Sequence, residues 1–388
     1  MLTAERVRPD SPEACAAILA RCAAERRTVR VRGGGTKDHL GARGDTDVLL
    51  ETAGLSGTID HVPADLTVTV SAGTPLAALA ERLADSGQFL SLDAPHISRG
   101  ATVGGAIATN SAGFGRLRYG GVRDLVLGLR CALADGTVAR SGGQVVKNVA
   151  GYDLNKLFGG SFGTLGVIVE ATLKVLPLPA AAEAASVAFR RSEDAFATAE
   201  AIVRTSLRPT ALVVEHADDD RWRLIVAAAD EPAPVARAMR EVRRLAALRD
   251  ASVEPVPDAA AVLGPLRDLV DRTTDGAVVR AALPLSAQRA FADAAVALGP
   301  FARLVADAGT GTAQVQLQGA DAAVVRAADA LVASARVLGG TARIERSSIR
   351  GLTTFGDQAP GGAFLMRRLK DAFDPTGILE PGRLALDR

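Results

Sequence analysis

The chain has 388 residues, 48% of them hydrophobic and 23% charged, which is typical of a globular protein with buried cores. Its 45 basic and 44 acidic residues give a net charge of +1, which argues against binding to nucleic acid or to an anionic membrane surface. No apolar run reaches the ~18 residues of a membrane span, the N-terminus lacks a signal-peptide core, and the three cysteines form no CxxC pair. We expect a cytoplasmic protein of two or three domains, without a disulfide or a metal site.

The first half of the chain predicts short strands and two helices. Ser11 and Pro12 are typical of a helix start, and this helix is expected to reach about residue 26. Thr74 and Pro75 are expected to cap a second helix that ends near residue 86. Strands are expected over 28–32, 48–51, 66–71, 125–134, 137–140 and 167–176, with a hairpin turn at 135–136.

A proline-containing stretch over 177–185 is expected to be a linker, and the pattern changes after it. Two sets of elements follow, each approximating the β-α-β-β-α-β order of a split ferredoxin-like unit, although no sequence repeat supports a duplication. The first set is strand 185–190, helix 192–205, strands 210–216 and 221–228, and helix 232–247. The second set is strand 277–283, helix 286–298, strands 302–308 and 312–318, helix 320–337 and strand 341–345.

Glycine is concentrated in one part of the chain: 25 of the 39 glycines fall in 33–166 and none in 1–32. The first dense motif is Gly33-Gly34-Gly35, which directly follows a predicted strand. Consecutive glycine amides can form a concave nest that accepts phosphate oxygens, but a mobile surface turn explains the triplet equally well. The motif matches neither a P-loop nor a GxGxxG fingerprint.

Two further motifs are rich in small residues. Residues 100–113 combine glycines with hydroxyl and amide side chains, which suits backbone lying flat against a long cofactor. Residues 159–168 form a glycine loop that enters a strand and can offer backbone groups to a heteroaromatic edge. Tight packing between elements and a plain turn are the respective alternatives.

In this order and spacing, the motifs resemble the FAD-binding domain of the vanillyl-alcohol oxidase / p-cresol methylhydroxylase (PCMH) superfamily over about 25–180. The segment 373–383 looks like that family's closing motif, with Glu380 where asparagine is usual. Within the superfamily, residues 142–179 look closest to the FAD-binding E subunit of bacterial glycolate oxidase, and 91–96 and 121–124 fit the same subunit.

The resemblance implies an α+β fold with a two-subdomain PCMH-type FAD-binding domain over 1–179. It also implies an α+β cap with ferredoxin-like units over 180–345 and a segment over 346–388 that returns to the FAD domain. The pyrophosphate would be held by Gly33, Gly34, Gly35, Thr36 and Lys37. The cofactor would be lined from the other subdomain by Thr102, Gly104, Gly105, Thr109, Ser111 and Gly113, and at its ribityl and pyrimidine end by Gly163, Gly166 and Ile168.

Many relatives attach FAD through a histidine in the first glycine loop, where this chain has about Thr36, with His39 offset. We therefore expect FAD to be held without a covalent bond. The segment 339–346 looks like the family's GG…EHG stretch, with Arg346 in place of the histidine. An arginine stays protonated and cannot act as a general base, so Arg346 either binds a carboxylate or makes a surface salt bridge.

Arg280 resembles an arginine of the family's substrate-side sheet, although an exposed strand arginine is the alternative. Arg280 and Arg346 are thus the two weak catalytic candidates. The resemblance implies an FAD-binding subunit of a glycolate (2-hydroxy acid) oxidase or dehydrogenase complex. Its partners would be a catalytic flavoprotein subunit and an iron–sulfur subunit, with membrane association only through partners. A stand-alone FAD-linked oxidoreductase and a non-catalytic scaffold remain open alternatives.

Overall fold

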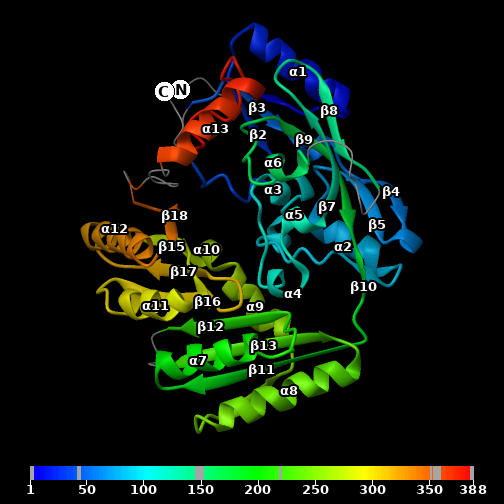
Figure 1. Ribbon diagram of the computed structural model, residues 1–388. Helices are drawn as coiled ribbons and strands as arrows, with labels where there is room; N and C mark the ends of the chain where they lie inside the picture. Colours follow the sequence, from blue (N-terminus) through cyan, green and yellow to red (C-terminus); the bar gives the residue numbers. More distant parts are fainter. Residues whose placement is uncertain are drawn as a thin grey trace. The chain divides into compact units, whose positions relative to one another are not determined.

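The computed structural model describes residues 4–41, 45–144, 153–217, 221–349, 352 and 360–384. They group into two compact units, which Figure 1 shows in sequence colours. Unit 1 comprises the described residues of 1–113, 120–178 and 357–388, and unit 2 those of 114–119 and 179–356. The six residues 114–119, which lie within the glycine-rich part of the sequence, therefore belong to unit 2.

The main sheet of unit 1 is antiparallel, with the strand order β4-β5-β9-β7-β8. Its strands are β4 (Thr58–Val62), β5 (Thr67–Ser71), β7 (Val126–Ala132), β8 (Val138–Gly142) and β9 (Val167–Lys174). The central strand β9 alternates between two cores: Ile168 and Ala171 pack in one, and Val167 and Val169 in the other. Residues 167–169 alternate between the two cores, and the pairing with β7 is irregular opposite 168–170, so this strand is covered on both faces.

Two smaller sheets complete the strands described in unit 1. The parallel sheet β1-β3-β2 contains β1 (Glu5–Val7), β2 (Val29–Arg32) and β3 (Val48–Glu51), and β6 (Gln88–Phe89) pairs with β10 (Leu176–Pro177). The helices of this unit are α1 (Pro12–Ala24), α2 (Leu76–Ala84), α3 (Val103–Ala108), α5 (Val122–Leu125), α6 (Asn155–Phe158) and α13 (Pro360–Phe373).

The predicted start of α1 is confirmed, because the Ser11 hydroxyl accepts a hydrogen bond from the amide of Ala14 at 3.2 Å. The predicted cap of α2 by Thr74 is wrong. Pro75 occupies the cap position without a side-chain bond, and the Thr74 hydroxyl instead accepts from the amide of Gly57 at 2.9 Å. A long-range contact has taken the hydroxyl that local sequence assigns to the helix end.

Unit 2 contains one eight-stranded antiparallel sheet with the order β14-β11-β13-β12-β16-β17-β15-β18. Its strands are β11 (Ala181–Phe189), β12 (Ala211–His216), β13 (Trp222–Asp230), β14 (Val253–Val256), β15 (Ala277–Ala282), β16 (Phe301–Asp307), β17 (Thr312–Leu317) and β18 (Thr341–Ser347). Its helices are α4 (Arg116–Tyr119), α7 (Ser192–Val203), α8 (Pro232–Ala247), α9 (Ala259–Arg267), α10 (Leu269–Arg272), α11 (Gln288–Val296) and α12 (Asp321–Val337).

The two predicted β-α-β-β-α-β sets are confirmed as elements, and β14 completes the first set. Pairing of β12 with β16 joins the two sets edge to edge into the single sheet. The predicted linker over 177–185 is too long, because β11 already begins at Ala181, which pairs with Asp230 of β13. Alanine has a weak strand propensity, so the pairing with β13 rather than the local sequence extends this strand.

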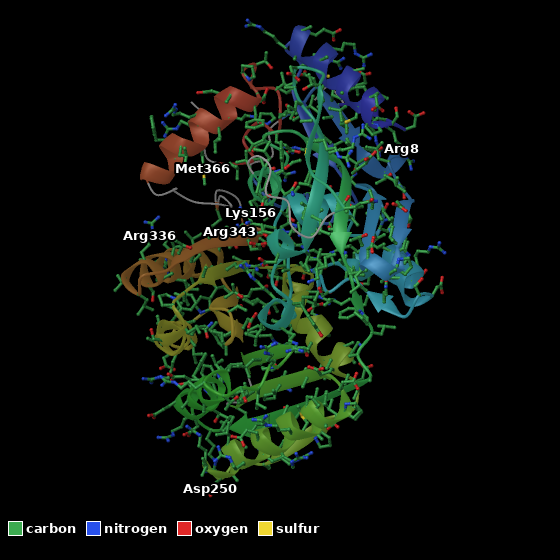
Figure 2. All side chains as sticks on the ribbon, turned by 45° about the vertical axis from the view of Figure 1, so that its right-hand side comes forward. Arg8, Lys156, Asp250, Arg336, Arg343 and Met366 are labelled. Atoms are coloured by element: carbon green, nitrogen blue, oxygen red, sulfur yellow. The ribbon has the colours of Figure 1, made fainter. Side chains whose placement is uncertain are left out.

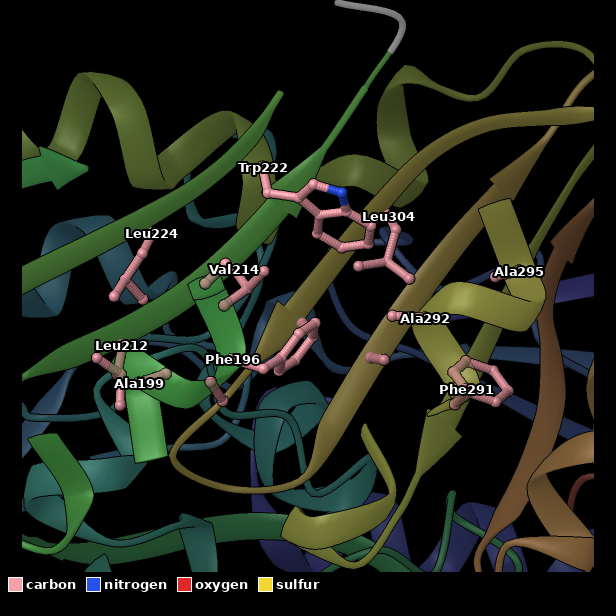
Figure 3. Close-up of a cluster of buried hydrophobic side chains, with 14 of the residues drawn as sticks. Phe196, Ala199, Leu212, Val214, Trp222, Leu224, Phe291, Ala292, Ala295 and Leu304 are labelled. Carbon is pink, nitrogen blue, oxygen red and sulfur yellow. The ribbon is translucent and has the colours of Figure 1, made fainter. Parts of the chain in front are cut away.

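Helices α7, α8, α11 and α12 bury their apolar sides against one face of this sheet. Figure 3 shows part of the resulting core, in which the ring of Phe196 lies edge-on to Trp222 at 6.0 Å between centroids. Charged side chains such as Arg336 on α12 and Asp250 beyond α8 lie on the surface (Figure 2). Among the described helices, none combines the length and the apolar character that crossing a bilayer requires.

Candidate cofactor site

An open cleft lies within unit 1, where the three glycine-rich stretches of the sequence converge. Twelve of the fourteen predicted cofactor residues line it: Gly33, Gly34, Gly35, Thr36, Lys37, Thr102, Gly104, Gly105, Thr109, Gly163, Gly166 and Ile168. Residues from three separate parts of the sequence thus share one concave surface.

Glycine is needed where the first two stretches touch. A Cβ atom on Gly34 would lie 1.8 Å from the carbonyl oxygen of Gly100, and one on Gly104 would lie 2.7 Å from the Cβ of Ala72. Gly35 adopts a φ of +69°, which favours glycine. The backbones therefore approach so closely only because side chains are absent, and the walls of the cleft expose peptide groups.

Lys37 connects the first stretch to the second. Its ammonium group donates hydrogen bonds to the hydroxyls of Thr109, at 3.0 Å, and Ser111. Ser111 does not itself line the cleft, and it contacts the cleft wall through Lys37 and Thr109. Gly113 also lies outside the lining, because it packs against Asp93, whose carbonyl oxygen would be 2.1 Å from an added Cβ.

The charged side chains of the cleft give it a net positive balance. Three cations, Arg32, Lys37 and Arg383, line it together with two carboxylates, Asp38 and Glu380. Arg32 and Asp38 form an ion pair at 2.7 Å that is substantially exposed. Exposed backbone amides together with this surplus of positive charge suit an anionic group such as a pyrophosphate.

Glu380 and Arg383 were not among the predicted cofactor residues. They reach the cleft because Asp374, at the end of α13, accepts hydrogen bonds from the amides of Ile378 (3.1 Å) and Leu379 (2.8 Å) and so folds the segment back. Leu379 then forms a parallel bridge with Val29. The signal available in the sequence was the closing motif at 373–383.

The third glycine stretch is held by an unusual backbone conformation. Phe162 has a φ of +56°, rare for a bulky residue, and its amide donates to the carbonyl of Ala108 at 2.8 Å. The next residue, Gly163, has a φ of +78°. The predicted motif residues 147–152 lie outside the described residues.

The four histidines are placed by packing and hydrogen bonds. The rings of His39 and His96 are edge-to-face at 6.4 Å, and neither residue lines the cleft. His61 Nε2 lies 2.9 Å from Gln88 Oε1, and His216 stacks on Trp222 at 4.4 Å. Thr36, the residue that the resemblance matched to a flavin-linking histidine, lines the cleft.

The two weak catalytic candidates both belong to unit 2. Arg280 on β15 lies in register between Gln314 of β17 and Arg343 of β18, and burial lowers the pKa of its guanidinium. Arg346 donates to the carbonyl of Val270 at 3.3 Å and lies 3.9 Å from Asp271. Its contacts are therefore those of a structural salt bridge.

Asp307, at the end of β16, is a buried carboxylate that sequence reasoning did not single out. Burial raises its pKa to about 6, against hydrogen bonds from Thr310 and Gly309 that lower it. The folded protein therefore binds a proton at Asp307 more tightly than the unfolded chain does. As the pH rises from about 4 to about 6, the free energy of unfolding should fall. We expect Asp307→Asn to remove this dependence and to raise the stability of unit 2 at pH 7.5 by up to ~3 kcal/mol.

Thermal unfolding of both proteins at pH 4 to 8 measures this effect, with the exposed Asp293→Asn as the matched control. A higher melting temperature of the wild type than of Asp307→Asn at pH 7.5 would show that the buried carboxylate does not destabilise unit 2. Melting temperatures that change in parallel for the two proteins from pH 4 to 8 would show the same.

Comparison with known proteins shows which family the sequence of this region matches. The sequence pattern of the FAD binding domain family matches residues 4–142, and that of the C-terminal domain of FAD linked oxidases matches residues 357–384. The chain contains an FAD-binding domain. Apart from residues 114–119, the matched residues 4–142 belong to unit 1, where the cleft also lies, and the resemblance drawn from the glycine motifs is confirmed at this level.

Relatives with matching sequence include glycolate oxidase subunit GlcE of Escherichia coli, 42% identical over 151 residues, which are 39% of this chain and 43% of GlcE. Glycolate oxidase subunit GlcD of Bacillus subtilis is 32% identical over 208 residues, which are 53% of this chain and 44% of GlcD. The match thus spans less than half of either relative. The fold is similar to that of p-cresol methylhydroxylase, with a TM-score of 0.79 at 15% identity, over 98% of this chain and 88% of that one.

The residues of the cleft fit FAD. Gly34 and Gly104 keep the walls free of side chains, and Lys37 supplies a cation beside the amides of the glycine triplet. A long cofactor with a charged pyrophosphate needs such a bare, positively charged wall. When bound, FAD supplies the electron-accepting chemistry that protein side chains lack.

Proposed function

We propose that this protein is the FAD-carrying subunit of a glycolate-type 2-hydroxy acid oxidase or dehydrogenase complex. The observation that supports this most is the cleft itself, built by a domain whose sequence matches a glycolate oxidase subunit at 42% identity. The amides of the first glycine stretch and Lys37 bind the pyrophosphate, and the loop around Gly163 contacts the flavin end. With Thr36 in place of a histidine, FAD is bound without a covalent link.

Arg280 is the residue we assign to the carboxylate of the 2-hydroxy acid. Its guanidinium makes no hydrogen bond or ion pair with another described residue, whereas the neighbouring Arg343 is held by Glu345 through two contacts at 2.9 and 2.8 Å. A planar guanidinium with no hydrogen bond to another described residue suits bidentate binding of a carboxylate. No histidine follows residue 216, and in this proposal the proton acceptor for the substrate hydroxyl comes from the partner that carries the main substrate site.

The partners in this proposal are a second flavoprotein that carries the main substrate site and an iron–sulfur subunit that passes electrons on. The name of the GlcE relative, a subunit of glycolate oxidase, supports an assembly. The two units of this chain would then have separate roles, with the cofactor in unit 1 and Arg280 in unit 2.

The decisive experiment is anaerobic reduction of the purified, FAD-loaded protein by glycolate or D-lactate, alone and together with the products of the neighbouring genes. We expect no bleaching of the flavin absorbance by the protein alone and rapid bleaching in the reconstituted complex. Rapid bleaching by the isolated protein would favour a stand-alone oxidoreductase. Failure to bind FAD, with retained pairing to a partner, would favour a scaffold.

A further inference from the structure

A buried carboxylate forms part of the wall of the FAD cleft. Glu380 is 3% exposed and adopts a φ of +49°, a conformation rare for residues other than glycine. Its Oε1 accepts a hydrogen bond from the amide of Val31 at 2.6 Å, and its Oε2 accepts from Arg383 Nε at 2.9 Å. These contacts fix the carboxylate in one position beside the cofactor site.

Two arginines pair with the Glu380 carboxylate, which still lines the cleft. Arg383 is 9% exposed, and Arg30 Nε lies 3.9 Å from Glu380 Oε2. Arg383 also donates to the carbonyl of Leu40, so its guanidinium is fixed by the backbone as well as by Glu380. Burial raises the pKa of Glu380, and these two cations together with the Val31 amide lower it.

The carboxylate lies close to the third glycine stretch. A Cβ on Gly163 would be 3.4 Å from Glu380 Cγ and 3.7 Å from Glu380 Oε1. Both residues line the cleft, and Glu380 is buried, so its charge acts through a lower effective dielectric than a charge in solvent.

We propose that Glu380 lowers the reduction potential of the FAD bound in this cleft. The inference rests on the proposed binding of FAD and deepens it. Reduction adds negative charge to the flavin, and a fixed carboxylate beside the third glycine stretch, which we assign to the flavin end, opposes that addition. Glu380 therefore favours the oxidised cofactor and makes the reduced cofactor a stronger electron donor.

The test measures the midpoint potential of the FAD-loaded protein at pH 8 in a dye-equilibrated reductive titration. Glu380→Gln keeps the size of the side chain and removes its charge, and we expect its potential to be more positive. A tenfold shift in the equilibrium corresponds to ~30 mV for a two-electron couple. Glu380→Asp keeps the charge but shortens the side chain, and its potential should remain near the wild-type value.

Asp38→Asn is the matched control, because Asp38 lines the same cleft but its side chain is 50% exposed and paired with Arg32. Solvent screening should leave the potential of this variant unchanged. An unchanged or more negative potential in Glu380→Gln would overturn the proposal, as would equal shifts in the Gln and Asp variants.

If Glu380→Gln does not retain FAD, the potential is measured in Glu380→Asn instead. Asparagine is also uncharged, and it is the residue expected at this position of the closing motif over 373–383. A more positive potential in that variant supports the proposal, and loss of FAD from every uncharged variant would show that Glu380 only positions the cleft. A wild-type protein that binds no FAD would instead contradict the proposed function.

Discussion

Replacing Gly34 by alanine is expected to lower the affinity for FAD at least tenfold. The added Cβ would lie 1.8 Å from the carbonyl oxygen of Gly100, and both groups belong to the backbone, so the two glycine stretches must separate. Overpacking of this kind costs ~1–3 kcal/mol. Because the strain falls on the cofactor wall itself, it should appear as weakened binding as well as a lower melting temperature.

The measurement is a titration of apoprotein with FAD, followed by flavin fluorescence. Gly143→Ala is the matched control, since an added Cβ there meets no heavy atom within 4 Å and the residue lacks a positive φ. An affinity of Gly34→Ala equal to that of the control would place the cofactor away from this wall.

Replacing Asp374 by alanine is expected to destabilise unit 1 by ~3–5 kcal/mol. The side chain of Asp374 is fully buried and lies 2.6 Å from Lys370 Nζ, besides accepting from the amides of Ile378 and Leu379. Its removal leaves the ammonium group without its carboxylate and two amides without acceptors. The segment that positions Glu380 should then detach, so FAD binding should weaken as well.

Urea denaturation with and without FAD measures both effects. The control Asp65→Ala changes an exposed residue of the same unit and should have the denaturation midpoint of the wild type. The midpoint of Asp374→Asn should lie between those of the wild type and Asp374→Ala, because asparagine keeps a hydrogen-bond acceptor but loses the charge. Equal denaturation midpoints for Asp374→Ala and Asp65→Ala would show that the closing motif does not stabilise the cleft.

The sequence predicted features that depend on local patterns. Ser11 at a helix start, the expected strands over 66–71 and 167–176 and both β-α-β-β-α-β sets are local signals of capping, composition and periodicity, and the structure has them. The three glycine stretches were recognisable because close backbone approach restricts the residue type to glycine.

Features that depend on distant pairing were not predictable in this way. Nothing local indicates that β12 pairs with β16, that Ala181 joins a strand, or that residues 114–119 pack in unit 2. Phe114, for example, is buried in the second core of unit 2 beside Val305. Such contacts depend on tertiary packing, which overrides weak local propensity.

The site shows the same division. The glycine stretches stand out in the sequence, and the resemblance assigned them and Lys37 to the cofactor, whereas Glu380 and Arg383 reach the cleft through the fold of the closing segment around Asp374. The closing motif was visible in the sequence, but its distance of more than 300 residues from the first glycine stretch concealed the contact with Val31.

The central claim is that FAD occupies the cleft formed by the three glycine stretches. Amide hydrogen exchange of the protein with and without FAD tests it most directly, because it reports protection segment by segment. We predict FAD-dependent protection in 33–37, 102–109 and 161–168, with no change in α8 of unit 2. Protection confined to unit 2, or unchanged exchange in all three stretches at saturating FAD, would contradict the account.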